Sequence, residues 1–119
     1  MKPIHCIFIL LFSVSCANKV VPKPDKLLSA EEMESIVYDM ALLKAAVAAD
    51  RSQFKEQAIT PLGYIYKKYD IDSLVYAQND LYYASKPLEY EVIYRRVEKR
   101  LQALKKTYDQ VAKETATIN

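Results

Sequence analysis

The fold is decided by residues 87–113, which read PLEYEVIYRRVEKRLQALKKTYDQVAK and carry the longest helical pattern in the chain. Apolar side chains recur there at intervals of four and three residues, which keeps them on one side of a helix for three heptads. The stripe consists of Tyr90, Tyr94, Val97, Leu101, Leu104, Tyr108 and Val111. Because an apolar stripe needs a cover, we expect the preceding part of the chain to pack against it.

Composition favours a single, all-α domain. Of the 119 residues, 51% are apolar and 27% are charged, which is typical of a globular domain. One glycine and five prolines are few for a sheet with tight hairpins and favour helices joined by short loops. A net charge of +2 provides no overall field that would attract nucleic acid, so we expect no nucleic-acid partner.

A capping box starts the first of three shorter helices. The Ser29 hydroxyl can accept a hydrogen bond from the Glu32 amide, and the Glu32 carboxylate can reach back to the Ser29 amide. Further along this helix, Asp39 lies beside the apolar face. If its carboxylate is partly buried, it needs a hydrogen-bond donor.

Further start and stop signals divide residues 51–86. Thr60 before Pro61 is an N-cap followed by proline at the first helical position, and Asp72 caps another helix. Between these helices, Asp70 must take the left-handed conformation that glycine adopts freely. Residues 51–59 have no clean period, and we expect a loop or a frayed extension of the first helix there. The four expected helices span about residues 30–50, 61–69, 73–84 and 87–113, within a helical domain at 29–119.

The first 15 residues have the layout of a secretory signal peptide, with an apolar run at 4–12 and small residues at 13–15. Because crossing a bilayer takes about 20 apolar residues, this run is too short to remain as a transmembrane helix. Cys16 follows where a bacterial lipobox places the cysteine that becomes acylated. We favour this lipoprotein signal over the alternative, an ordinary secreted protein cut after Ser15 or Ala17.

The cysteines support an anchor. Cys6 lies within the apolar run, so the mature chain keeps only Cys16 and forms no internal disulfide. Residues 16–28 would hold the acylated cysteine and a tether, because Pro22 and Pro24 favour extended backbone. We therefore expect a membrane partner through acylated Cys16.

No set of residues indicates a reaction. His5 belongs to the signal peptide, and the mature chain therefore lacks the histidines of common metal sites and of Cys-His or Ser-His nucleophiles. We expect no metal ion, no cofactor and no enzymatic activity. Glu31 and Glu34 form a carboxylate pair one turn apart, but acidic residues in a first helical turn complement the helix dipole. A hydrolase built on them is the weakest hypothesis.

Tyrosines cluster where the second, third and fourth helices meet. The chain has ten tyrosines, and a phenol offers both an apolar face and a hydroxyl to a sugar, peptide or small ligand. Their helical spacing favours a role in the core, with the hydroxyls reaching its edge. The residues of the possible ligand face are Tyr66, Tyr69, Tyr83 and Tyr90.

Basic residues gather on the fourth helix. They are Arg95, Arg96, Lys99, Arg100, Lys105 and Lys106. One interpretation is a docking surface for an acidic partner or lipid phosphate. We favour the other, the solvated outer face of a helix whose C-terminal half suits cations.

Several segments together resemble a known family. They are residues 67–74 (KKYDIDSL), 81–87 (LYYASKP), 90–101, 29–33 (SAEEM) and 38–42 (YDMAL). In their order they look like the small Bacteroidota lipoproteins of domain-of-unknown-function family 4296. That resemblance implies a cell envelope with two membranes and brings no activity with it. In that group, lipoproteins sent to the cell surface tend to carry acidic residues just after the acylated cysteine, and none follows Cys16 here. The resemblance therefore favours the outer membrane, with the protein facing the periplasm.

Helix lengths indicate a candidate interaction surface. At about 1.5 Å per residue the short helices cannot cover the whole stripe, so we expect Tyr90, Tyr94 and Val97 to be buried and the rest to depend on the reach of the first helix. An exposed apolar seam marks contact with another chain. The predicted partner-binding residues are Leu101, Leu104, Tyr108 and Val111.

These observations predict a non-catalytic interaction or assembly component of the envelope, which binds a protein partner or a second copy through its distal fourth helix. The alternative is a lipoprotein that binds a small ligand or glycan at the tyrosine-rich joint of the helices.

Overall fold

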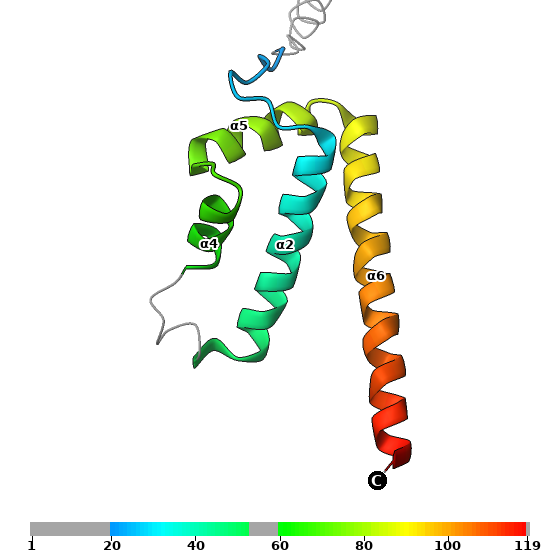
Figure 1. Cartoon of the computed structure of the whole chain (residues 1–119). Helices are drawn as coiled ribbons and strands as arrows, with labels where there is room; N and C mark the ends of the chain where they lie inside the picture. Colours follow the sequence, from blue (N-terminus) through cyan, green and yellow to red (C-terminus); the bar gives the residue numbers. More distant parts are fainter. Residues whose placement is uncertain (1–19, 53–59, 119) are drawn as a thin grey trace, which may run out of the picture.

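The computed structural model describes residues 20–52 and 60–118, and within these ranges it contains helices and no strand. The helices are α2 (Ala30–Ala49), α4 (Pro61–Lys68), α5 (Ser73–Ala84) and α6 (Pro87–Ile118) (Figure 1). The all-α fold class and the long C-terminal helix are confirmed. That helix continues to Ile118 instead of ending near residue 113. The signal peptide, Cys16 and most of the segment 51–59 lie outside the described residues.

Side-chain caps set three of the helix starts. Ser29 Oγ accepts from the Glu32 amide at 3.1 Å, and Glu32 Oε2 accepts from the Ser29 amide at 2.7 Å, which closes the predicted capping box of α2. Thr60 Oγ1 accepts from the Gly63 amide at 3.1 Å at the start of α4. Asp72 caps α5 in the same way, at 2.8 Å. Each cap satisfies an amide that has no partner within its own helix.

The turn after α4 has the predicted backbone. Asp70 has a φ of 50° and is the one non-glycine residue at positive φ in the described part of the chain. Its carbonyl oxygen accepts from Lys26 Nζ at 2.7 Å, and the next amide, that of Ile71, donates to Tyr66 O at 3.0 Å. The turn therefore brings Ile71, which is 9% exposed, into the core.

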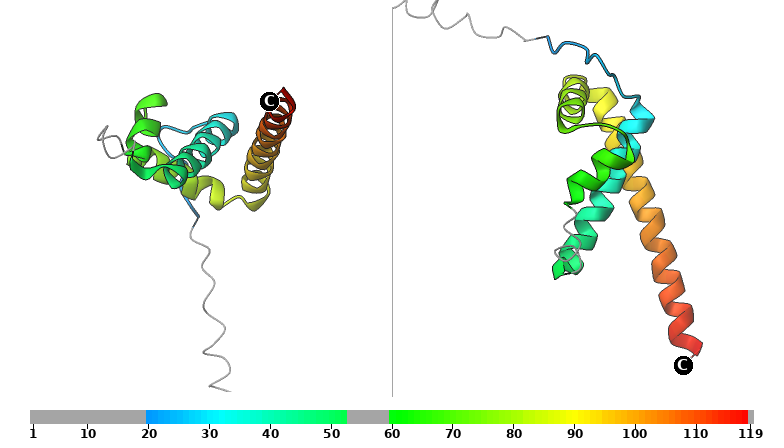
Figure 2. Two further views of the ribbon diagram at one scale, coloured as in Figure 1. Left: turned by 90° about the horizontal axis from the view of Figure 1, so that it is seen from below. Right: turned by 60° about the vertical axis from the view of Figure 1, so that its left-hand side comes forward.

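Helix α2 occupies the middle of the domain. It packs against α6 on one side and α4 on the other, and α5 crosses the end where the chain enters from residue 20 (Figure 1). From that end α6 runs past the last turn of α2, and its C-terminus lies far from the entering segment (Figure 2). The distal part of α6 therefore extends beyond the helix that covers its first turns.

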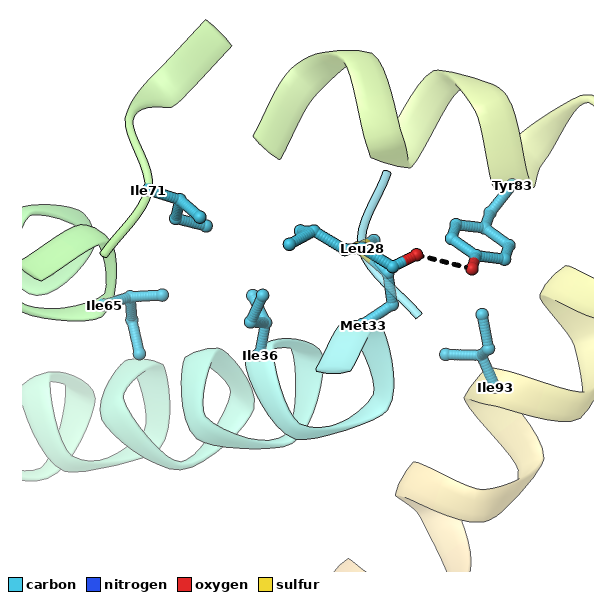
Figure 3. Packing of buried hydrophobic residues seen from close by; sticks show 7 residues of the cluster. All are labelled: Leu28, Met33, Ile36, Ile65, Ile71, Tyr83 and Ile93. Atoms are coloured by element: carbon cyan, nitrogen blue, oxygen red, sulfur yellow. Dashed lines mark hydrogen bonds between the residues drawn. The ribbon is translucent and has the colours of Figure 1, made fainter. Parts of the chain in front are cut away.

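The core draws on the N-terminal segment and all four helices (Figure 3). Its buried residues are Leu28, Met33, Ile36, Ile65, Ile71, Tyr83 and Ile93. On α6, Ile93 and Val97 are only 2% and 4% exposed, whereas Tyr94 is 43% exposed. The prediction that Tyr94 is buried is therefore wrong. A core centred on Ile93 leaves the residue 100° further round the helix on its flank.

The last residues of the expected tether belong to the folded domain. Asn79 of α5 is fully buried, and its side chain accepts from the Leu28 amide and donates to the Lys26 carbonyl, both at 2.8 Å. The Tyr83 hydroxyl donates to the Leu28 carbonyl at 2.7 Å (Figure 3). These bonds hold the Leu28 side chain in the core at 4% exposure. The tether is thus shorter than predicted, because residues 26–28 are docked on α5.

Candidate functional site

The predicted partner-binding residues form one continuous stripe on α6. Leu101 and Leu104 are partly buried beside α2, whereas Tyr108 is 67% exposed and Val111 is 54% exposed. Their spacings of three, four and three residues continue the row that is buried at Val97. We call these four residues the distal seam. The two distal residues of the seam are thus more exposed than Leu101 and Leu104, which lie nearer the domain.

Three of the four tyrosines of the predicted ligand face have their hydroxyls in hydrogen bonds within the domain. Tyr83 is 5% exposed, with its hydroxyl on the Leu28 carbonyl. The Tyr69 hydroxyl donates to Asp39 Oδ2 at 2.5 Å, and the Tyr90 hydroxyl donates to Asp80 Oδ1 at 3.0 Å.

Electrostatics and ring contacts at these tyrosines agree with this structural role. Burial, followed by the hydrogen bonds with Tyr94 and Asp80, raises the pKa of Tyr90 well above its usual value. The Tyr66 ring lies against that of Tyr76, with centroids 6.4 Å apart. These contacts agree with the role in the core that the helical spacing of the tyrosines favours.

A groove that the sequence did not reveal lies along α2. Its volume is about 970 Å³, its floor is α2 and its walls come from α4, α5 and α6. The lining residues are Val37, Met40, Ala41, Leu43, Lys44, Val47, Ala48, Arg51, Thr60, Pro61, Leu62, Ile65, Tyr76 and Tyr94. The tyrosines that line the groove, Tyr76 and Tyr94, are not among the four predicted ones. Periodicity identifies the apolar face of a single helix, whereas a groove depends on how several helices are placed relative to one another.

Two of the six cations on α6, Arg96 and Arg100, contact α2, although their side chains are 52% and 42% exposed. Arg100 lies over the Tyr38 ring, 3.9 Å from its centroid, and its Nη1 donates to Glu34 Oε1 at 3.2 Å. Arg96 Nη1 lies 3.7 Å from Glu31 Oε1 and 3.8 Å from Glu34 Oε2. These two cations are therefore solvated and also contribute to the contact between α6 and α2. Glu31 and Glu34, the carboxylate pair considered above, are thus paired with the two arginines.

Asp39 has the donors that partial burial required. Its Oδ2 accepts from Lys68 Nζ at 2.6 Å and from the Tyr69 hydroxyl at 2.5 Å, and its side chain is 18% exposed. Burial opposes ionisation, but the bonds from Lys68 and Tyr69 outweigh it and lower the pKa of the Asp39 carboxyl. Burial and the hydrogen bond with Asp39 raise the pKa of the Tyr69 hydroxyl. This cluster joins α2 to the end of α4 and has the character of a structural ion pair.

The described residues contain neither a metal-ligand cluster nor a membrane-spanning helix. Within residues 20–52 and 60–118, no group of three or more His, Cys, Asp or Glu side chains is arranged to hold a metal ion. Within those same ranges, no helix has both the length and the apolar character needed to cross a membrane.

Comparison with known proteins gives one match. No curated protein and no solved structure matches the chain. A family model does match, over residues 24–107, a range that begins at the docked N-terminal segment and ends within α6. Since this range covers more than half of the sequence, the chain belongs to the family described as Domain of unknown function (DUF4296).

Proposed function

We propose that this protein is a membrane-anchored envelope lipoprotein that acts as a non-catalytic interaction or assembly component, with the distal seam as its contact surface. The observation that carries the proposal is the exposure of Tyr108 and Val111, at 67% and 54%, on the stripe that is buried at Val97. Large apolar side chains at helical spacing on an uncovered helix face are typical of protein-binding helices.

The anchor in this proposal is acylated Cys16 at the periplasmic face of the outer membrane of a Bacteroidota cell. The chain enters the domain beside α5, and α6 ends at the opposite extremity (Figure 1). A protein held at residue 16 would therefore present the distal seam away from the lipid. The absence of acidic residues at positions 17–20 supports the periplasmic side.

The charged pairs support a role without catalysis. Glu34, the better buried member of the carboxylate pair, is only 15% exposed and lies between Arg96 and Arg100. Both arginines belong to α6, so Glu34 contributes to the contact between α2 and α6.

Site-specific photo-crosslinking in cells tests the contact surface. A photoreactive phenylalanine analogue at Tyr108 should give a discrete covalent adduct, because the seam is where the partner binds. The matched control carries the same analogue at Lys106, which lies half a turn away on the same helix, and should give no adduct. The absence of adducts at position 108 would contradict the proposed function.

The anchor is tested separately by fractionation. Cys16→Ala removes the acylation site, so the variant should move from the membrane fraction to the soluble envelope fraction while its helical circular dichroism stays unchanged. Retention of the variant in the membrane fraction would show that the chain is held there by something other than Cys16.

The groove along α2 favours a second candidate, binding of a small ligand. Its lining is apolar apart from Lys44, Arg51, Thr60 and the hydroxyls of Tyr76 and Tyr94. Such a groove fits an apolar molecule with an anionic group better than it fits a glycan. A saturable change in tyrosine fluorescence with a long-chain fatty acid, lost in Met40→Lys, would support this candidate.

A further inference from the structure

The outer side of α5 is apolar and uncharged. Asn79 and Tyr83 of this helix are buried, at 0% and 5% exposure. At about 100° per residue, Leu74 and Leu81 lie on the opposite side, and they are 62% and 59% exposed. Asp80, the one charged residue of the helix, is partly buried. The exposed residues of α5, which we call the α5 face, are Ser73, Leu74, Ala77, Gln78, Leu81 and Ala84.

The α5 face lies at the end of the domain that is nearest to the proposed anchor. Pro24 and Leu28 are buried, and the segment that they bound docks on α5. Pro24 follows Cys16 by eight positions, so even a fully extended chain keeps Pro24 within about 29 Å of the acylated residue. Helix α5 lies across this end of α2, and α6 leads away from it (Figure 1).

We propose that the α5 face rests on the bilayer that holds the anchor, with Leu74 and Leu81 at the boundary between the headgroups and the acyl chains. This inference rests on the proposed function, because it takes Cys16 as the anchor. It adds a second contact with the lipid, and two contacts orient a domain where a single flexible tether does not. The distal seam on α6 is then held away from the membrane.

The size of the α5 face suits a lipid surface better than a protein partner. Helix α5 has 12 residues, so it is about 18 Å long, and one side of a helix is about 10 Å wide. The resulting area of roughly 200 Å² is well below the roughly 600 Å² per partner of a small specific interface. A tethered domain does not need that area, because the anchor raises the effective concentration of lipid beside the face. Each leucine that leaves water then favours docking by roughly a factor of ten.

Charged side chains at the two ends of α5 are of both signs and are held within the domain. Lys26 Nζ donates to the Asp70 carbonyl at 2.7 Å. Asp72 is engaged as the cap of α5, and Lys86 Nζ lies 3.3 Å from Glu89 Oε1. The contact with lipid should therefore depend on the leucines and not on attraction to anionic headgroups.

Quenching of a single tryptophan by brominated lipid tests the contact. The chain has no tryptophan, so Gln78→Trp places one probe on the α5 face and leaves both leucines in place. Gln110→Trp is the matched control, because Gln110 is an exposed glutamine on the far part of α6. The protein is isolated with its anchor from the membrane fraction and reconstituted in phosphatidylcholine vesicles whose acyl chains carry bromine.

The expected result is a loss of tryptophan fluorescence at position 78 and no loss at position 110. Addition of anionic phosphatidylglycerol should leave both results unchanged. No quenching at position 78, or equal quenching at both positions, would overturn the proposal. A strict requirement for anionic lipid would overturn it as well, because the lysines would then carry the contact.

Serine substitutions in the Gln78→Trp chain test the role of the leucines. Leu74→Ser together with Leu81→Ser should weaken docking by roughly 100-fold and abolish the quenching. Tyr64→Ser together with Val92→Ser removes two apolar residues that are exposed elsewhere, at 49% and 39%, and should leave the quenching unchanged. Helical circular dichroism should be the same for both pairs. Quenching that survives the loss of both leucines would contradict the proposal.

A chemical anchor separates this test from the test of the proposed function. The chain that begins at Cys16 contains every described residue, and its single thiol can be coupled to a maleimide lipid. If Cys16→Ala remains in the membrane fraction of cells but the coupled chain is quenched at position 78, the lipid contact is supported and only the anchor is wrong. If Cys16→Ala is released but neither sample is quenched, the anchor is right and the lipid contact is overturned.

Discussion

Asp39 joins α2 to the end of α4 through its charge. A half-buried carboxylate would be unfavourable alone, but Lys68 and Tyr69 both donate to the same oxygen. Since the folded pKa is lowered, the ionised carboxylate stabilises the fold fully above the ordinary carboxyl pKa of about 4, and this contribution is lost as the pH falls through the folded value. The free energy of unfolding should therefore decrease at acid pH, as Asp39 becomes protonated.

Asp39→Asn should flatten the acid side of the stability profile. We expect the variant to be less stable near neutral pH by about 1 kcal/mol or less, because Lys68 is 46% exposed and solvent screens the pair. As the pH falls from about 4 through the lowered folded pKa, the difference from the natural chain should shrink, since protonation progressively removes the charge. Urea unfolding at several pH values measures this. Asp109→Asn, at an exposed position, is the control and should leave the profile unchanged.

Asp70 carries backbone strain in the turn after α4. At a φ of 50°, an aspartate side chain costs energy that glycine does not. Asp70→Gly should raise the free energy of unfolding by about 0.5 to 1 kcal/mol. The contact with Lys26 survives because it uses the Asp70 carbonyl. Asp72→Ala, which removes the cap of α5, should shift the denaturation midpoint in the opposite direction, and a decrease for both variants would exclude strain at Asp70.

The helices were predictable because their signals are local. Ser29, Thr60 and Asp72 each mark a start as a cap, and the observed helices begin at the next residue. Pro87 marks a start through its fixed φ and is itself the first residue of α6. Local periodicity predicts less accurately which residues of a helix are buried. Tyr94 and Ile93 are neighbours on α6, and only the position of the facing helices decides which one is buried.

The docking of the N-terminal segment was not predictable from local signals. Asn79 interrupts an apolar pattern in α5, but its partners are 51 and 53 residues away in the chain, on Leu28 and Lys26. The groove along α2 escaped prediction for the same reason, since its lining comes from four helices. In contrast, predicting the distal seam required only the approximate lengths of α2 and α6, and the helix signals in the sequence indicated both.

Asn79 should be essential for this docking. Asn79→Ala leaves the buried Leu28 amide and the Lys26 carbonyl without partners, so we expect a loss of roughly 2 to 4 kcal/mol in chemical unfolding. Asn79→Asp keeps the acceptor but loses the two bonds that the Asn79 amide nitrogen donates, to the carbonyls of Lys26 and Val75, and it should also destabilise. Tyr83→Phe removes one bond to the Leu28 carbonyl and should cost about 1 to 2 kcal/mol. Full stability of Asn79→Ala would mean that residues 26–28 are not part of the cooperative unit.

The domain and the distal seam are separable parts of one molecule. All the buried residues of the described chain lie between positions 24 and 97, and α6 loses its last partial burial after Leu104. The part of α6 after Leu104 is therefore helical but adds no described buried side chain to the domain. A helix end without tertiary contacts gains its stability from continuity with the packed turns before it.

Ending the chain after Thr107 should therefore remove association and leave the fold. At low protein concentration, where pairing does not add to stability, we expect the free energy of unfolding to change by less than about 1 kcal/mol, because only exposed residues are removed. The helical circular dichroism should fall by no more than the lost turns. Ending the chain after Arg96 is the matched comparison. It removes Val97 and the Arg100 contact with Glu34 and Tyr38, and should lower stability by at least the roughly 2 to 5 kcal/mol of a core truncation. If the chain that ends at Thr107 unfolds as readily as the one that ends at Arg96, then Tyr108 and Val111 belong to the domain itself, and the distal seam is part of its core instead of a surface for another chain.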